Sequence, residues 1–319
     1  MLNRRILRIK AFKVLYSYAE NPSMTLKEAK NQLEISCRAT RRLYLFMLAL
    51  VPALTKEASE RIEAARSKFN PTEEEKHPNM KFVQGPLSAI LSQDPDFQKV
   101  ISKEKLSWDQ YDVFLRHLYD SVKQSEYFAE YMASGRQSLK EDAALFTKIF
   151  ERELVDSAEL EDILEDLSIY WNDDLAYALT CCCRSLDEIA SGKGWSLPPL
   201  YQSELKHKEG QDSDQVFVTN LLTDAFVNYG KYFDRISASV PKWDPDRLFI
   251  IDIVLIICGI AEAKSFSEMP LKVTINEYVD ISKYYSTPKS RSFVNGLLDK
   301  ILQEMTLSGE IVKTGKGLL

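Results

Sequence analysis

The sequence contains little glycine and no long apolar run. Glycine accounts for 11 of 319 residues, roughly half of the usual ~7% share. Because glycine supplies many tight turns, its scarcity argues against a many-stranded sheet and favours helices. The most apolar stretch, 248–263, is shorter than the ~20 residues that span a bilayer, and Asp252 interrupts it. We therefore expect a buried core helix there, no membrane partner, no secretory signal and a cytoplasmic protein.

Residues that typically bind metals or carry out catalysis are also sparse. The chain has three histidines and five cysteines, three of them consecutive at 181–183. Consecutive side chains on a helix point about 100° apart, so one ion cannot easily bind all three thiols. Buried, reduced cysteines are expected instead. No glycine-rich phosphate loop, His-Glu-x-x-His motif or isolated Cys-x-x-Cys pair is present. The sequence therefore predicts no metal, no cofactor and no enzymatic activity.

What the sequence does contain is helical periodicity, which predicts an all-α fold. Helices are expected at 4–19, within 25–60, and at 108–132, 139–154, 158–190, 214–240, 246–263, 274–285 and 288–306. The charged stretch 68–78 and the stretch 191–213, which contains several glycines and prolines, are predicted surface connections. Residues 271–275 show a weak alternation of apolar and polar side chains, which suggests an extended segment.

Two segments share a spacing that suggests an internal repeat. Phe146 precedes Trp171 by 25 residues, and Phe217 precedes Trp243 by 26. An aspartate-rich helix start follows each tryptophan. Duplication of a helical hairpin and two unrelated hairpins with a common pattern both remain open.

The formal net charge of −6 requires any RNA-binding surface to be a local basic patch. One such patch opens the chain, because five basic residues precede the first acidic one, Glu20: Arg4, Arg5, Arg8, Lys10 and Lys13. A helix N-terminus favours anions, so these cations gain nothing from the helix dipole. The phosphates of a bound RNA would neutralise these positive charges. A solvated basic helix start is the alternative.

A second basic region begins a predicted helix near the C-terminus. Thr287 is a suitable N-cap, and Pro288 then fits the first helical position. The next residues include Lys289, Ser290 and Arg291, at a helix start where backbone N–H groups can bind phosphate. Phe293, one turn further on, is expected either to stack on a base or to lie in the core.

Gly296 lies inside this predicted last helix. Glycine in a helix interior costs about 1 kcal/mol relative to alanine. A cost of that size predicts that another backbone packs closely against the helix at this position.

Three segments together resemble the NusB family. The residues Ile-Asn-Glu at 275–277 are followed by Phe-Val-Asn-Gly-Leu-Leu-Asp-Lys at 293–300, which looks like the family's C-terminal signature. The basic helix 4–18, leading into Val-Leu-Tyr-Ser, is similar to the family's arginine-rich first helix. The third match is Trp-Asp-Pro-Asp-Arg-Leu at 243–248, leading to Ile-Asp at 251–252. The three segments occur in the family's order.

The resemblance implies a NusB-like helical bundle of two subdomains, enlarged by inserted helices. Residues 1–55 and 212–319 would form the discontinuous NusB-like domain, and 56–211 a helical insertion whose Trp171 hairpin repeats the family's central helices. NusB-like proteins pair with the ribosomal protein NusE and bind the boxA element of nascent ribosomal RNA. Their complex loads onto RNA polymerase and suppresses premature termination.

Family positions carried onto this chain imply one set of RNA-binding residues: Arg4, Arg5, Arg8, Lys10, Tyr16, Lys289, Ser290 and Phe293. Lys289 stands where the family commonly has an acidic residue. Ile253 and Ile257 stand where it usually has arginines, and Ala261 replaces an aromatic residue ahead of Glu262. The missing arginines at 253 and 257, with the acidic net charge, favour an alternative: a helical protein-interaction adaptor that keeps the fold without binding RNA.

Overall fold

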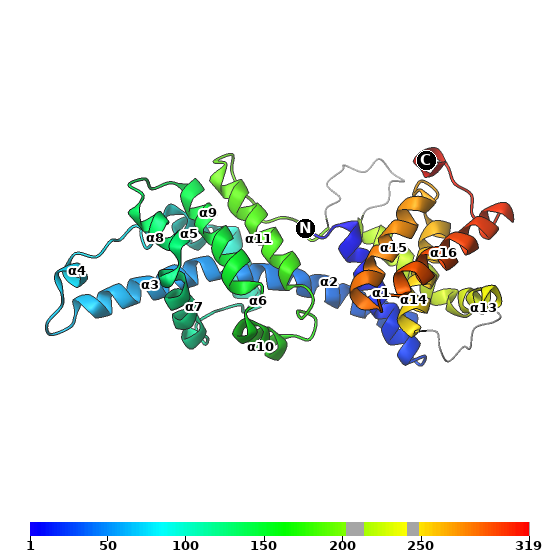
Figure 1. The fold of residues 1–319 in the computed structure, drawn as a ribbon, viewed down its shortest axis with the longest axis horizontal. Helices are drawn as coiled ribbons and strands as arrows, with labels where there is room; N and C mark the ends of the chain where they lie inside the picture. The colour runs from blue at the N-terminus through cyan, green and yellow to red at the C-terminus, as the bar shows by residue number, and fades with distance from the viewer. Residues whose placement is uncertain (202–213, 241–248, 319) are drawn as a thin grey trace. The chain divides into compact units, whose positions relative to one another are not determined.

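The computed structural model describes residues 1–201, 214–240 and 249–318, and the chain forms two compact units (Figure 1). Unit 1 comprises Met1–Cys37 and Pro199–Leu319, and unit 2 comprises Arg38–Pro198. Apart from one isolated bridge between Leu2 and Tyr201, the described ranges contain helices, turns and coil only. The predicted all-α fold class is therefore confirmed. The predicted division into a family-like domain and an insertion rests on family resemblance and stays a prediction. Its limits are 1–55 with 212–319 for the domain and 56–211 for the insertion.

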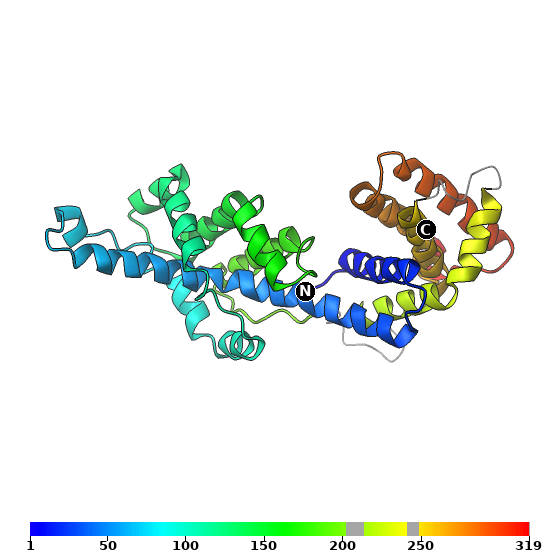
Figure 2. The ribbon, with the colours of Figure 1, turned by 90° about the horizontal axis from the view of Figure 1, so that it is seen from below.

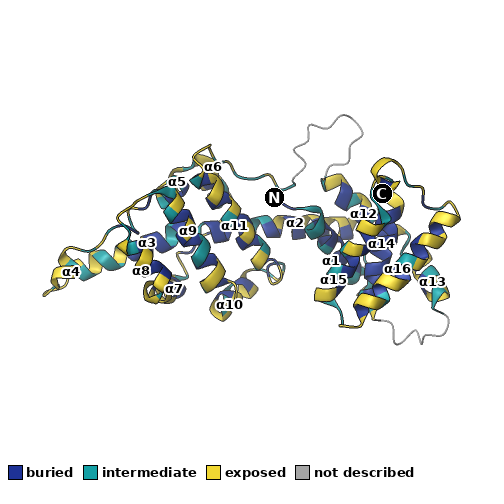
Figure 3. Cartoon of the chain, turned by 45° about the horizontal axis from the view of Figure 1, so that its top comes forward, coloured by how far each residue is buried: buried dark blue, intermediate teal, exposed yellow. Residues whose placement is uncertain are grey.

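Unit 1 is built around helix α14. The helices of this unit are α1 (Arg4–Glu20), the first half of α2 (Leu26–Leu48), α12 (Asp214–Val227), α13 (Tyr229–Ser239), α14 (Ile250–Ser265), α15 (Leu271–Tyr285) and α16 (Ser290–Leu307), with a short 3-10 helix at Gly315–Leu318. Every residue of α14 from 252 to 263 is buried (Figure 3). Helices α1, α12, α13, α15 and α16 all pack on it, and α1 also lies against α12 (Figures 1 and 2). The apolar stretch 248–263 thus supplies the predicted core helix.

Unit 2 consists of the second half of α2 and shorter helices that follow it. They are α3 (Leu50–Arg66), α4 (Glu73–Lys76), α5 (Pro86–Gln93), α6 (Pro95–Glu104), α7 (Asp112–Gln124), α8 (Glu126–Ala133), α9 (Leu139–Ile149), which continues as a π-helical turn (Phe150–Leu154), α10 (Ala158–Leu167) and α11 (Leu175–Ala190). Helix α9 packs on α11, and α3 packs on α5 and α7. No helix within the described ranges is long and apolar enough to cross a membrane.

Aromatic stacking fills the centre of unit 2. The ring of Phe46 on α2 stacks on Trp108 and Trp171, with centroids 4.1 and 5.7 Å apart. Trp108 donates its indole N–H to the carbonyl of Phe46 at 2.8 Å, and Trp171 donates to the carbonyl of Ala39 at 2.9 Å. Each buried indole therefore has a hydrogen-bond acceptor, which removes the cost of desolvating its N–H group.

The structure corrects several predicted helices. Residues 271–275, whose alternation suggested an extended segment, belong to α15. The predicted helix 108–132 is two helices, because Ser125 is extended and its hydroxyl caps α8 by accepting from the Phe128 N–H at 3.3 Å. The predicted helix 158–190 is also two, with α10 ending at the extended Ser168. Helix α16 begins at Ser290, so Thr287 is not its N-cap residue.

The close backbone approach expected at Gly296 is absent, and a close contact with a side chain occurs at Gly259 instead. A Cβ atom on Gly296 would meet nothing within 4 Å. A Cβ atom on Gly259, in α14, would lie 2.7 Å from Cδ2 of Leu298. Gly259 therefore allows α14 and α16 to pack closely.

The suggested repeat has a counterpart in the order of helices. Helix α12 begins 75 residues after α9, at Asp214 and Leu139. Helix α14 likewise begins 75 residues after α11, at Ile250 and Leu175. Helix α9 packs on α11 as α12 packs on α14. Trp243 lies outside the described residues, and duplication of the hairpin stays a prediction that this spacing supports.

Candidate nucleic-acid interface

The first turn of α1 presents two arginines at a capped helix start. The side chain of Asn3 accepts a hydrogen bond from the Ile6 N–H at 3.0 Å and so satisfies one free donor of the turn. Arg4 lies 3.3 Å from a carboxylate oxygen of Asp214, and Arg5 lies 3.5 Å from one of Asp280. The two arginine side chains are 42% and 39% exposed, so a ligand can reach both guanidinium groups.

Arg8, one turn further on, is buried and holds α1 to α14. Its side chain is 4% exposed, and two of its nitrogens contact both carboxylate oxygens of the fully buried Glu262, at 2.7 and 2.9 Å. Thr274 and Tyr278 donate hydroxyl hydrogen bonds to the same carboxylate, at 3.0 and 3.2 Å. Burial, reinforced by the charge of Glu262, raises the pKa of Tyr278, which therefore keeps the proton that it donates.

Two further residues of the predicted RNA-binding set are also buried. Lys10 is 1% exposed and Ser290 is 2% exposed. The Ser290 hydroxyl forms hydrogen bonds with Ser286 at 2.8 Å and Thr287 at 2.9 Å. Family position alone placed Arg8, Lys10 and Ser290 near RNA, but all three residues are buried in the structure of the free chain.

Aromatic contacts bring α1 to the junction between α15 and α16. The rings of Phe12 and Tyr285 have centroids 5.5 Å apart, and the Lys13 ammonium lies 5.4 Å from the Tyr285 centroid. Tyr16 follows on α1, half-buried, with its ring centroid 6.5 Å from that of Phe12. Sequence reasoning missed Tyr285, whose only signal was its place beside Tyr284, directly before the predicted turn.

The junction itself carries exposed positive charge. Lys289 and Arg291 are exposed, and within the described part of the chain neither has an ion-pair partner. No side chain caps the start of α16, so the positive end of the helix dipole adds to these charges. Phe293 is half-buried one turn into the helix. The junction turn is tied to α14 by a 2.6 Å hydrogen bond that Ser286 donates to Asp252.

The departures from the family pattern on α14 lie in the core. Ile253 is 6% exposed and Ile257 is 0% exposed, so arginines at these positions would be buried. The third segment of the resemblance, 243–248, lies outside the described residues.

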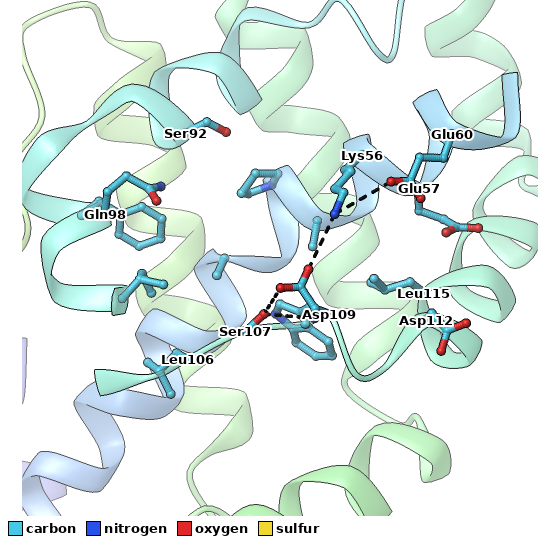
Figure 4. Close-up of a pocket in the computed structure, with 16 residues that line it drawn as sticks. Lys56, Glu57, Glu60, Ser92, Gln98, Leu106, Ser107, Asp109, Asp112 and Leu115 are labelled. Carbon is cyan, nitrogen blue, oxygen red and sulfur yellow. Dashed lines mark hydrogen bonds and ion pairs between the residues drawn. The ribbon is translucent and has the colours of Figure 1, made fainter. Parts of the chain in front are cut away.

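A pocket of about 420 Å³ in unit 2 does not add an anion site (Figure 4). Phe97, Trp108 and Leu115 contribute apolar lining. Its lysine, Lys56, lies between two carboxylates, 3.8 Å from Glu60 and 3.7 Å from Asp109 (Figure 4). The positive charge is therefore already balanced.

The cysteines are buried or half-buried thiols, as expected. Burial raises the pKa of Cys181, Cys182, Cys183 and Cys258, which keeps these thiols protonated at neutral pH. The described residues contain no group of three or more His, Cys, Asp or Glu placed to hold a metal ion.

Comparison with known proteins gives one consistent family. The family model that describes the NusB family matches residues 191–303. The chain is similar to proteins named transcription antitermination protein NusB: 32% identical over 143 residues in Chloroherpeton thalassium, 34% over 107 in Salinibacter ruber and 35% over 100 in Thermodesulfovibrio yellowstonii. These alignments cover 45%, 34% and 31% of this chain, and 63%, 67% and 66% of the relatives. No solved structure matches the chain.

Proposed function

This chain belongs to the NusB family, and on that premise we propose that it is a transcription antitermination factor that binds a boxA-type single-stranded RNA together with ribosomal protein NusE. The complex would join the RNA polymerase antitermination complex in the cytoplasm and suppress premature termination in ribosomal RNA transcription. The name of the three relatives supports the antitermination role. The chain spans about two thirds of the length of these relatives, so their activity and partners enter here as part of the proposal.

The observation that carries the proposal is the meeting of two basic segments far apart in sequence. Phe12 and Lys13 on α1 both contact Tyr285, the last residue of α15. The chain then turns into Lys289 and Arg291, whose charges are exposed. On a protein of net charge −6, a local group of cations from two elements is the surface that suits RNA phosphate.

The residues of the predicted set that are not buried would bind the RNA. These residues are Arg4, Arg5, Tyr16, Lys289 and Phe293, joined by Lys13 and Arg291. The cations attract phosphates without regard to sequence. Tyr16 and Phe293 are half-buried, and in this proposal their rings stack on unpaired bases, which would favour single-stranded RNA.

The carboxylates beside Arg4 and Arg5 do not prevent this role. Both ion pairs are longer than 3.2 Å and partly exposed. Pairs of this kind contribute about 0–1 kcal/mol, so phosphate can displace them at little cost. Arg8, by contrast, would act as a positioning residue that fixes α1 in place.

Titration of a fluorescent boxA-type RNA with the full chain, with and without purified NusE, tests the proposal. We expect anisotropy to report specific binding that tightens when NusE is present, and a scrambled RNA of equal length to bind more weakly. Absence of binding in both conditions would favour the protein-interaction adaptor, for which the buried Ile253 and Ile257 are the supporting observation.

A further inference from the structure

Unit 2 carries a long segment of negative charge that the proposed RNA surface does not use. Between Arg152 and Arg184 the chain has nine acidic residues and no basic one. Seven of these nine side chains are exposed: Asp156, Glu159, Glu161, Asp162, Glu165, Asp166 and Asp173. The segment contains all of α10 and the start of α11.

This charge is largely unneutralised within the chain. Asp156, Glu161, Asp162 and Asp166 have no ion-pair partner among the residues that the structure describes. Asp162 and Asp166 lie four positions apart on α10, a spacing at which like charges repel. The last turn of α10 also has no basic residue to offset the negative end of the helix dipole. Helix α10 therefore keeps this charge at a cost to its own stability.

A groove of about 430 Å³ opens beside the same carboxylates. Its apolar lining includes Val155, Leu164 and Leu175. Its acidic lining includes Asp156 and Glu161, with Asp173 from the start of the α11 segment. The groove thus combines apolar contact area with negative charge.

The same acidic segment, 153–174, also carries exposed apolar side chains, of which Val155 lines the groove. Val155 is 43% exposed, Leu167 is 39% exposed and Ile169 is 80% exposed. The outer side of α10 is correspondingly exposed in Figure 3. Apolar side chains bordered by polar groups are typical of a protein-interaction site.

We propose that this groove, which we call the α10–α11 groove, binds a basic amphipathic helix of a partner protein. Charge complementarity selects a cationic occupant and repels nucleic acid, whose phosphates have the same sign as the rim. The apolar lining selects side chains such as leucine, and a helix presents leucines on one face with lysines or arginines beside them. The inference is independent of the RNA proposal, because it rests on unit 2 and on charge of the opposite sign.

A synthetic peptide and the full chain test the proposal. The probe is a fluorescein-labelled 18-residue helical peptide with leucines at positions i, i+3, i+4 and i+7 and lysines on both sides. We expect saturable binding by anisotropy that weakens about tenfold when the triple variant Asp156→Asn, Glu161→Gln, Asp162→Asn removes three charges. These substitutions relieve repulsion on exposed positions, so the variant should fold, which circular dichroism checks.

A matched control separates the groove from general acidity. The triple variant Glu63→Gln, Glu74→Gln, Glu188→Gln removes the same charge from exposed positions elsewhere in unit 2 and should leave the affinity within about twofold. Equal weakening by both triple variants would overturn the proposal, and so would a peptide that does not bind.

The apolar part of the groove has its own test. Val155→Ser with Leu175→Ser should also weaken peptide binding about tenfold, because both side chains line the groove and neither is fully buried in the free protein. Unchanged binding would mean that charge alone attracts the peptide, which contradicts the groove. A concentration-dependent dimer in sedimentation that this double variant abolishes would assign the groove to a second copy of the chain and equally overturn the proposal.

Discussion

Arg8 and Glu262 join α1 to α14 through an ion pair that is almost completely removed from water, with side chains 4% and 0% exposed. Burying two charges costs several kcal/mol unless the geometry is good and the remaining polar atoms are satisfied. Here two hydrogen bonds link the partners, and Thr274 and Tyr278 donate to the same carboxylate. The pair therefore fixes α1 at one angle and position on the core of unit 1.

Removing one partner of this pair should destabilise the protein strongly. Arg8→Met leaves the buried charge of Glu262 uncompensated and should lower the free energy of unfolding by about 3–5 kcal/mol, measured by urea denaturation. The double variant Arg8→Met, Glu262→Gln keeps an acceptor for Thr274 and Tyr278 but removes the charge, so it should lose clearly less. A double variant that is as unstable as the single one would contradict this account of the pair.

The thiols should react in the order of their exposure. Cys183 is half-buried, while Cys182 and Cys258 are fully buried, and burial raises the pKa of all three. The thiolate is the reactive form, so at pH 8 iodoacetamide should modify Cys183 first, and Cys182 and Cys258 only after unfolding. Because the pKa of Cys183 is raised, its rate should continue to increase as pH rises past 9. Mass spectrometry of peptides checks the order, and equal rates for Cys182 and Cys183 would contradict it.

At the scale of helices, two glycines of one unit should respond oppositely to the same change. Gly259→Ala places a Cβ atom 2.7 Å from Cδ2 of Leu298 and should lower the free energy of unfolding by about 1–3 kcal/mol, because the fully buried Leu298 side chain must shift within a packed core. Gly296→Ala meets nothing within 4 Å and should raise stability by about 0.5–1 kcal/mol. Urea denaturation of the two variants gives the comparison, and destabilisation by both would mean that α16 packs differently.

Periodicity located most helices but not their ends. The predicted helix across 108–132 missed the break at Ser125, because one extended serine ends a helix and caps the next without glycine or proline. The alternation at 271–275 was misleading, because α15 buries residues at helical spacing, such as Thr274, Ile275 and Tyr278. Tertiary packing, which a local pattern does not contain, decided both cases.

The sequence showed the two basic segments of the proposed RNA surface, but it did not show which of their side chains are buried. Arg4, Arg5 and Arg8 look alike in the sequence, yet only Arg8 meets a buried carboxylate, which stands 254 positions away. The exposure of Gly296 and the burial of Glu262 could not be predicted from the sequence either, because neighbours far away in the chain decide whether a residue is exposed or enclosed. Motif spacing therefore predicted the family and the two basic segments, while the division of their residues between surface and core required the structure.

For the whole molecule, the net charge of −6 conceals two regions of opposite sign. In unit 1, cations of α1 and of the α15–α16 junction form the proposed RNA surface. In unit 2, α10 and the segment after it carry exposed carboxylates beside the α10–α11 groove. An acidic protein can thus bind a polyanion locally and a cationic partner elsewhere.

The salt dependence of RNA affinity tests the central claim most directly. Each phosphate contacted on single-stranded RNA contributes about −0.7 to the slope of log affinity against log salt. The triple variant Arg5→Ala, Lys289→Ala, Arg291→Ala should therefore reduce the magnitude of that slope by about 2. The control Lys99→Ala, Arg136→Ala, Lys140→Ala removes equal charge from exposed positions of unit 2 and should leave it unchanged. Identical slopes for the wild-type chain and both variants would contradict the proposed RNA surface.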